Sequence, residues 1–337
     1  MKSLKGDFLM QAFEYASPTA PEEAAKLLAG SWGETEVLAG GTDLLNLMKD
    51  YITTPKRVVS LQKVKGLGGI DFKAGKELRL GAMATLQELI DTPGLREEYA
   101  GLVQAAENIS SPQVRAVGTV GGDLLQRPYC WYYRAGFGLL AMLNGKSLVS
   151  NGDNRYHAIL GNSGPAYFVS PSRLAPMLIA LGAKVKVQGP HGAHEMPVEK
   201  LFVTPKAEGE REHALKPNEI LVEIIVPHHG GAKTAVYDVL QREVMDWPLA
   251  SAVVVLHMDG DKVKSARVVL GQVAPVPWPS PEAEQALAGK PVNAGVAGDA
   301  GKAALSKATP LSQNGYKVQL ARVAVKRAVL RAAGKEA

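Results

Sequence analysis

The chain has 337 residues, 46% of them apolar, and a formal net charge of +5. This length favours two or three domains with substantial cores. The single cysteine excludes an internal disulfide and a four-thiolate metal site built by this chain alone, and no apolar stretch approaches the roughly 18–20 residues that span a bilayer.

The two ends of the chain carry little targeting information. Residues 1–10 contain two lysines but no apolar run long enough for a signal-peptide core, so we expect no secretory signal and a cytoplasmic protein. The basic residues near the C-terminus, between 322 and 335, are typical of a solvated helix face rather than a nucleic-acid patch.

The first segment, residues 10–62, has the pattern of a small α/β unit. Thr19 and Glu22 predict a helix start with Thr19 as the N-cap. We expect strands at residues 36–39 and 57–61, and between them a helix at 44–48, whose apolar residues recur at helical spacing.

A second segment, residues 63–228, begins and ends with strand patterns. Strands are expected at residues 69–72 and 77–81, then helices at 86–90, capped by Thr85, and at 97–109. A polar and aromatic loop runs to about residue 155. A helix at 174–181, a hairpin at 184–198 and a strand at 220–226 complete this part.

The pattern changes after a glycine-rich linker near residues 228–232. Strands are expected at 235–240 and 262–271, and the apolar run at 249–256 fits either a helix or a strand. Three helices, at 281–287, 296–308 and 316–333, would cover this sheet and make a C-terminal domain at 232–337.

Two glycine pairs stand out for their possible chemistry. They are the first glycine segment, Ala39-Gly40-Gly41-Thr42-Asp43, and the second glycine segment, Thr119-Val120-Gly121-Gly122-Asp123. Backbone N–H groups approach a pyrophosphate closely only where no Cβ intervenes, and threonine hydroxyls add donors. Either pair alone would more often be a plain tight turn, but together they indicate a clamp for one diphosphate.

Two better-known phosphate motifs are poorly supported by this sequence. Neither segment has the G-x-G-x-x-G spacing of a dinucleotide-binding βαβ unit, and no Walker lysine follows. Because Asp43 and Asp123 would repel a phosphate, we expect these carboxylates to fix the turns or to bond a ribityl hydroxyl.

Several segments in order along the chain resemble the FAD-binding medium subunits of the xanthine dehydrogenase and carbon monoxide dehydrogenase family of molybdenum hydroxylases. Besides the two glycine segments, the resemblance rests on Leu80-Gly-Ala-Met-Ala-Thr, Asn218-Glu-Ile-Leu, Asp246-Trp-Pro-Leu-Ala-Ser and Pro310-Leu-Ser-Gln-Asn-Gly-Tyr. It covers nearly the whole chain.

The resemblance implies an α+β fold. A two-lobed FAD-binding domain of the vanillyl-alcohol-oxidase/PCMH type would occupy residues 1–228, with lobe one at about 10–62 and lobe two at about 63–228. A small α+β domain, an antiparallel sheet with helices, would follow at 232–337. No catalytic residue and no metal ligand is expected on this chain. The residues implied to contact FAD are Leu38, Ala39, Gly40, Gly41, Thr42, Asp43, Leu44, Gly118, Thr119, Gly121, Gly122, Asp123, Leu125, Ile159 and Leu160.

The same resemblance implies the partners. A small subunit with two-iron iron–sulfur clusters would deliver electrons, a large subunit with the molybdenum cofactor would oxidise the substrate, and an external acceptor would reoxidise the flavin. Export together with a signal-bearing partner subunit stays open under this interpretation.

Two positions depart from the family pattern. Arg173 stands where the family usually has an acidic residue near the ribityl chain, and it is expected either to pair with Asp123 or a phosphate or to be a solvated arginine at a helix start. One branch of the family binds a four-iron cluster in the loop after the second glycine segment. Here Cys130 matches a first ligand but Ala166 replaces another, so a cluster-free loop is expected.

Two other functions remain open from the sequence. One is a self-sufficient FAD-dependent oxidase or reductase, and the other is a cofactor-free scaffold subunit that kept the fold. The short C-terminal part leaves little room for a substrate cap, which argues against the oxidase.

Overall fold

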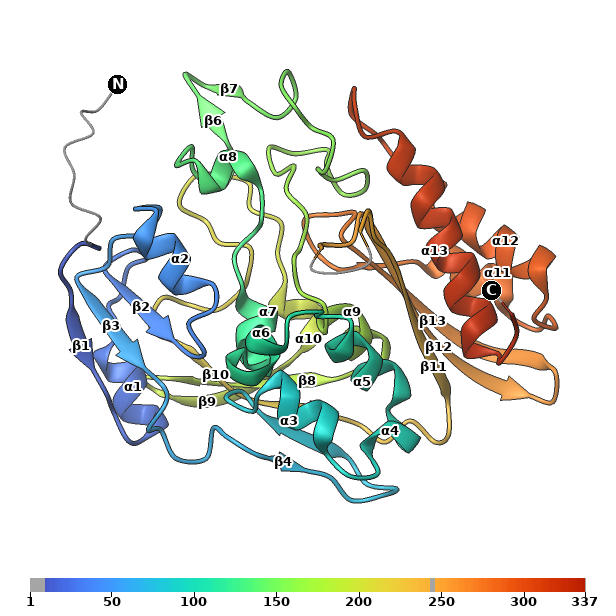
Figure 1. The fold of residues 1–337 in the computed structure, drawn as a ribbon, viewed down its shortest axis with the longest axis horizontal. Helices are drawn as coiled ribbons and strands as arrows, with labels where there is room; N and C mark the ends of the chain where they lie inside the picture. The colour runs from blue at the N-terminus through green and yellow to red at the C-terminus, as the bar shows by residue number, and fades with distance from the viewer. Residues whose placement is uncertain (1–9, 243–245, 337) are drawn as a thin grey trace.

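The computed structural model describes residues 10–242 and 246–336 (Figure 1). The first nine residues, on which the expectation about a secretory signal depends, lie outside the described part. Within it, the chain forms sheets of three, five and four strands and one two-stranded hairpin. No described helix is long and apolar enough to cross a membrane.

Lobe one is a parallel three-stranded sheet in the order β1-β3-β2, with helices beside it. Its elements are β1 (Glu14–Ala16), α1 (Pro21–Leu27), β2 (Thr35–Leu38), α2 (Leu44–Lys49) and β3 (Arg57–Ser60). Ala24 and Leu28 pack against Val59 and, across to lobe two, against Ile220. The predicted cap is wrong by one residue: Ala20 is the N-cap of α1, because Pro21 takes the first helical position.

Lobe two is built on an antiparallel five-stranded sheet in the order β4-β5-β10-β8-β9. Its strands are β4 (Ile70–Asp71), β5 (Leu78–Gly81), β8 (Lys184–Gly189), β9 (Gly192–Pro197) and β10 (Ile220–Val226). Its helices are α3 (Leu86–Asp91), α4 (Leu95–Glu98), α5 (Ala100–Glu107), α6 (Pro112–Val117), α7 (Val120–Leu125), α9 (Ala175–Ala180) and α10 (Val198–Leu201).

Two expectations for the helices of lobe two have different outcomes. Thr85 caps α3 as predicted, and a capping box forms with Glu88. The single helix expected at 97–109 is two helices, α4 and α5, because Tyr99 leaves the helical conformation (φ −114°, ψ 43°) while its side chain is fully buried in the core.

The long connection between α7 and α9 is mostly irregular. It contains α8 (Trp131–Arg134) and the hairpin β6 (Met142–Leu143) with β7 (Lys146–Ser147). In Figure 1 this connection stands at the top of the molecule, above the elements that carry the two glycine segments.

The C-terminal region is an antiparallel sheet in the order β11-β12-β13-β14 with three helices. Its elements are β11 (Lys233–Val239), β12 (Ala250–Asp259), β13 (Lys262–Gly271), β14 (Trp278–Pro279), α11 (Pro281–Leu287), α12 (Ala294–Ala304) and α13 (Tyr316–Ala332). The run at 249–256, which fitted a helix or a strand, is therefore a strand: residues 250–256 lie in β12.

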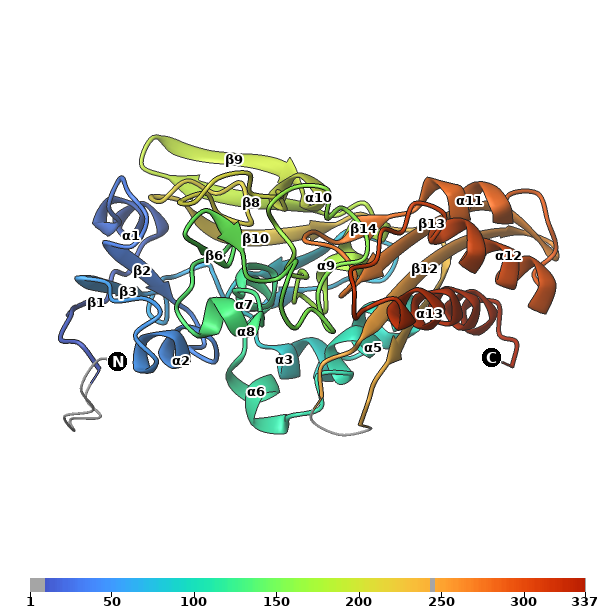
Figure 2. The same cartoon turned by 90° about the horizontal axis from the view of Figure 1, so that it is seen from above.

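The sheet of the C-terminal region is covered on both faces. Val253 and Val255 pack in the core that includes α5 and α9, whereas Val254 and Leu256 pack in the core formed with α11, α12 and α13. Figure 2 shows the three C-terminal helices along the outer side of this sheet. The expected α+β architecture is confirmed, and the boundary near residues 228–232 stays a prediction.

Candidate functional site

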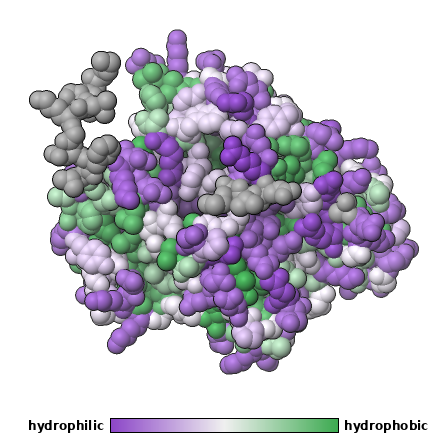
Figure 3. Space-filling model, viewed as in Figure 1, coloured by the Kyte–Doolittle hydropathy of each residue, from purple (hydrophilic) through white to green (hydrophobic). Residues whose placement is uncertain are grey.

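A cavity of about 400 Å³ lies where lobe one, lobe two and the start of the C-terminal region meet. On the face seen in Figure 3, a hollow opens near the centre of the molecule with apolar residues inside it. Most of the expected cofactor residues line this cavity, namely Ala39, Gly40, Gly41, Thr42, Asp43, Leu44, Gly118, Thr119, Gly121, Gly122, Asp123 and Leu125.

The first glycine segment follows β2 and turns the chain into α2. Gly41 has a φ of +78°, which residues with a Cβ rarely adopt. A Cβ on Gly40 would lie 1.9 Å from the carbonyl oxygen of Val117, so the first segment touches the end of α6, next to the second segment. Both glycines are therefore required by the backbone itself.

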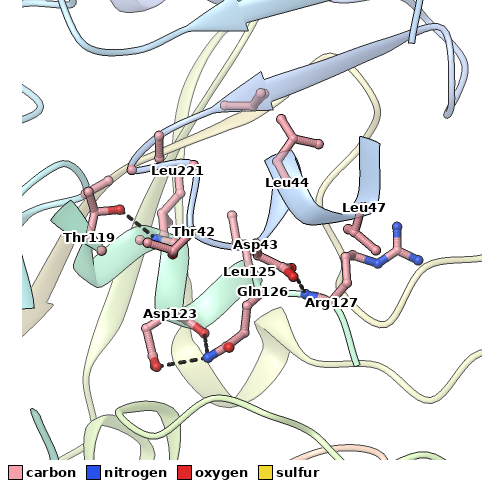
Figure 4. Close-up of a pocket in the computed structure, with 18 of the residues that line it drawn as sticks. Thr42, Asp43, Leu44, Leu47, Thr119, Asp123, Leu125, Gln126, Arg127 and Leu221 are labelled. Carbon is pink, nitrogen blue, oxygen red and sulfur yellow. Dashed lines mark hydrogen bonds between the residues drawn. The ribbon is translucent and has the colours of Figure 1, made fainter. Parts of the chain in front are cut away.

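The second glycine segment is not the isolated turn that the sequence indicated. It is the first turn of α7, and the hydroxyl of its N-cap, Thr119, accepts a hydrogen bond from the backbone N–H of Gly122 at 3.0 Å (Figure 4). A Cβ on Gly121 would lie 2.8 Å from the carbonyl oxygen of Ala82, whereas one on Gly122 would meet only Thr119 Oγ1. At Gly122 the backbone therefore lines the cavity with no side chain in front of it.

The two segments differ in the backbone donors that they leave free. In α7 the amides of Val120 and Gly121 donate to Ala84 and Ala82, and that of Gly122 is held by its cap. Within the described chain, the amides of residues 40–43 in the first segment donate no hydrogen bond. Consecutive free amides next to a residue with positive φ are the donors that an anion-binding concavity needs, and of the two segments only the first keeps such a run.

The two aspartates fix the segments, as the first of the two alternatives predicted. Asp43 accepts from the backbone N–H of Arg127 at 2.7 Å (Figure 4). It also accepts from the guanidinium of Arg134 at 2.8 Å, and the two bonds tie the start of α2 to the long connection. Asp123 accepts from Ser172 Oγ and from the amide of Leu174. Burial raises the pKa of Asp123, while these hydrogen bonds oppose the rise.

One end of the cavity, here called the closed end, is lined by partly buried charged and aromatic residues that the sequence did not single out. Glu36 of β2 pairs with Arg211 at 3.1 Å, and the Arg211 guanidinium lies over the ring of Trp32 at 4.6 Å. His213 meets Trp32 edge-on, with 5.3 Å between ring centroids. No sequence pattern could reveal this cluster, because the residues that meet are about 175 positions apart.

Burial sets the protonation of this closed end. It lowers the pKa of His213 to about 4, so that this ring is neutral near neutral pH. Burial also raises the pKa of Glu36, against the attraction of Arg127. A second ion pair, Arg127 with Glu212 at 2.5 Å, lies beside the first.

The other end of the cavity opens to the surface. Tyr129 of the long connection and Trp247 of the β11–β12 connection pack with ring centroids 4.2 Å apart, and both are exposed. The Arg134 guanidinium lies 4.4 Å from the Tyr129 ring centroid. Residues 108–111, at the end of α5, complete this open end.

Arg173 lines the cavity near residues 108–111 and is neither solvated nor paired through its side chain with Asp123. Its backbone N–H donates to Asp123 at 3.2 Å, while its guanidinium pairs with Asp238 of β11 at 2.6 Å and donates to the Asn108 carbonyl at 3.2 Å. The ion pair is buried, with both side chains about 5% exposed.

Three of the expected cofactor residues do not line the cavity. Leu38 is the last residue of β2. Its Cδ1 would lie 3.3 Å from a Cβ on Gly41, so its side chain packs against the first segment. Ile159 and Leu160 are fully buried in the core of the C-terminal region, and both of their amides donate to Val273. The structure does not bring these two to the cavity.

Cys130 lies in the long connection beside a histidine. Its Sγ is 3.3 Å from His157 Nε2, and burial raises the pKa of the thiol. Ala166 is buried in the small core against which Cys130 packs. Within residues 10–242 and 246–336, no three His, Cys, Asp or Glu side chains gather closely enough to hold a metal ion.

Two known protein families match nearly the whole chain. Residues 11–229 match the family described as "FAD binding domain in molybdopterin dehydrogenase", and residues 235–332 match "CO dehydrogenase flavoprotein C-terminal domain". The protein is therefore an FAD-binding oxidoreductase subunit with the expected two-part fold.

Within that class, the chain belongs to the FAD-binding medium subunits of the molybdenum hydroxylases. It is 28% identical over 321 residues to the carbon monoxide dehydrogenase medium chain of Hydrogenophaga pseudoflava, covering 94% of this chain and 96% of that one. It is 32% identical over 272 residues to an aldehyde oxidoreductase FAD-binding subunit of Escherichia coli, covering 80% and 84%.

Solved structures agree with this assignment. The carbon monoxide dehydrogenase from Hydrogenophaga pseudoflava that lacks the Mo-pyranopterin moiety superposes with a TM-score of 0.76 at 27% identity, over 97% of this chain and 98% of that chain. Quinoline 2-oxidoreductase from Pseudomonas putida 86, at 22% identity and a TM-score of 0.75, shares the fold.

Proposed function

We propose that this chain relays electrons within a heteromeric molybdenum hydroxylase. A large partner subunit with the molybdenum cofactor oxidises the substrate, and a small partner with two-iron clusters delivers electrons one at a time. The FAD of this chain collects two of them and passes them to an external acceptor. The chain then contributes position and electronic tuning, since the redox chemistry belongs to the cofactor.

We place the pyrophosphate of FAD at the first glycine segment. The observation that carries this placement is the run of four free amides at residues 40–43 around the positive φ of Gly41, facing the cavity beside α7. In the second segment, the backbone at Gly122 leaves room for a bound group, because no side chain covers it. The Thr119 hydroxyl can donate its proton to that group, while its oxygen accepts the capping bond of α7. These residues fit a diphosphate between the two lobes.

The two ends of the cavity favour one orientation of FAD. The isoalloxazine ring must be reached by an electron donor and an acceptor, so we assign it to the open end near Ser111, Tyr129 and Trp247. The adenine then lies at the closed end beside Trp32 and Glu36. The acceptor would approach at the open end.

The test is purification of the complex from its native source. We expect a yellow chain with one FAD, co-eluting with a small iron–sulfur subunit and a large molybdenum subunit. A flavin-free chain inside such a complex would instead support the scaffold alternative. A lone yellow chain that turns over a substrate unaided would support the oxidase alternative.

The location of the complex stays a prediction. We propose a cytoplasmic complex. Fractionation of cells with a flavin-fluorescence assay tests this point. Recovery in an exported fraction would indicate transport with a signal-bearing partner.

A further inference from the structure

We propose that Arg173 and Asp238 tune the reduction potential of the flavin, with Arg173 as the charge that favours reduction and Asp238 as the charge that limits it. This inference rests on the proposed function, because it requires FAD in the cavity with its ring at the open end.

The backbone places Arg173 at the cavity wall. It lies one residue before Leu174, the N-cap of α9, and its amide donates to Asp123 of the second glycine segment. Its side chain runs from there to the end of α5, where it lines the cavity beside Asn108 and the residues of the open end. The guanidinium therefore lies at the cavity wall beside residues of the proposed ring position.

The guanidinium is only partly used by the protein. Its Nη2 makes the contacts to Asp238 Oδ2 and to the Asn108 carbonyl, and within the described chain its Nε and Nη1 donate no hydrogen bond. A guanidinium carries five N–H donors in a fixed plane, so most of them remain for a bound group.

Asp238 is the counter-charge of Arg173 and is not positioned to contact the cofactor. Its Oδ2 accepts from Arg173 at 2.6 Å and from the Asn108 side-chain amide at 2.7 Å, whereas its buried Oδ1 has no partner. Asp238 is not among the residues that line the cavity. The positive member of the pair thus faces the cavity and the negative member stands behind it.

Stability alone is a weak reason for this arrangement. Burying two charges costs desolvation that their attraction often only offsets, and apolar residues of similar size would frequently serve as well. Leaving Asp238 Oδ1 unpaired adds to that cost. A role at the cavity explains why the charges lie here.

The charge balance of flavin reduction gives the sign of the effect. Two electrons from the clusters of the partner subunit and one proton from solvent add one net negative charge to the bound ring. A nearby positive charge favours that form and a nearby negative charge disfavours it, and both effects are strong where water is excluded. Arg173 should therefore raise the potential, and Asp238 should lower it.

The test uses the full-length chain with bound FAD and the variants R173Q, R173K, D238N and R173Q/D238N. The flavin-to-protein ratio is measured first, and the midpoint potential is then measured at one pH against a reference dye. We expect R173Q to lower the potential, D238N to raise it and R173K to stay near wild type. The midpoint potentials of R173Q and D238N should each differ from that of the wild type by at least about 30 mV. For a two-electron couple this difference is a tenfold change in the equilibrium constant with the dye.

Opposite signs separate tuning from a merely structural ion pair, whose loss would affect both single variants alike. Unchanged potentials, or shifts of R173Q and D238N in the same direction, would overturn the inference. If R173Q does not fold, the nearly isosteric D238N variant still tests the proposal. A midpoint potential of D238N that does not rise above the wild-type value would contradict it. A wild-type chain without FAD would refute the proposed function itself and the inference with it.

Discussion

Replacing Gly122 by alanine tests the contact that we propose between α7 and the cofactor. The added Cβ would lie 2.9 Å from Thr119 Oγ1 and meet nothing else within 4 Å in the protein. Weakening this cap costs at most about 1 kcal/mol, and alanine offsets part of it because it is a better helix residue than glycine by about 0.5–1 kcal/mol. The melting temperature of the apoprotein should therefore change by no more than about 2–4 °C.

The effect on FAD binding should be larger. The methyl group enters the cavity where we place the diphosphate, and the Thr119 hydroxyl must shift away from its donor position. Loss of one such hydrogen bond to a charged group corresponds to about 1–3 kcal/mol, or a roughly 5- to 150-fold weaker dissociation constant. Titration of the apoprotein with FAD, followed by quenching of flavin fluorescence, measures it.

Gly295 provides a matched control. It also lies in the first turn of a helix, α12, and its added Cβ would lie 3.3 Å from the capping oxygen of Asn293, far from the cavity residues. Gly295→Ala should bind FAD like the wild type. If Gly122→Ala bound FAD equally tightly with an unchanged melting temperature, the placement of the diphosphate beside α7 would be wrong.

Three further predictions follow from the site and its surroundings. Gly40→Ala should lower the unfolding free energy by about 2–4 kcal/mol, because the backbone of Val117 must move, and an unchanged denaturant midpoint would refute the close contact. The pKa of His213 is about 4 in the folded chain, below its usual 6.5, so the unfolding free energy should fall as the pH drops from about 6.5 to 4. His213→Gln should lose less unfolding free energy over this pH range, as measured by urea unfolding. The same pH dependence in the variant and the wild type would contradict this prediction. The isolated chain should contain essentially no iron, since Cys130 stands alone, and stoichiometric iron and sulfide would overturn this expectation.

Local patterns predicted the elements well where one face of an element is apolar. The strands of lobe two and the capping box at Thr85 are examples, because strand alternation and capping are both encoded within a few residues. Residues 249–256 stayed ambiguous for a physical reason. Both faces of β12 are buried, so its apolar run has no period that distinguishes a strand from a buried helix.

Twelve of the fifteen residues expected to contact FAD line the cavity, but the sequence did not reveal which segment keeps its backbone donors free. Gly40, Gly41 and Gly122 were recognised from their types, yet the hydrogen bonds of α7 to residues 82 and 84 could not be read from sequence, and they remove the expected amide donors of the second segment. The closed end and the Arg173–Asp238 pair depend on contacts between distant parts of the chain. Such pairs follow from tertiary packing, which no local pattern contains.

The double coverage of the C-terminal sheet has a consequence for biosynthesis. Residues up to 228 leave the ribosome first, with the sides of α5 and α9 that later meet β11, β12 and β13 still uncovered. Domains generally fold as units in the order of synthesis, and transiently exposed apolar surface promotes aggregation. The C-terminal region expressed alone would likewise expose Val253, Val255 and Val269. A nonsense mutation near residue 230 should therefore leave an aggregation-prone N-terminal fragment, and a proteolytic cut there should expose apolar surface on both fragments.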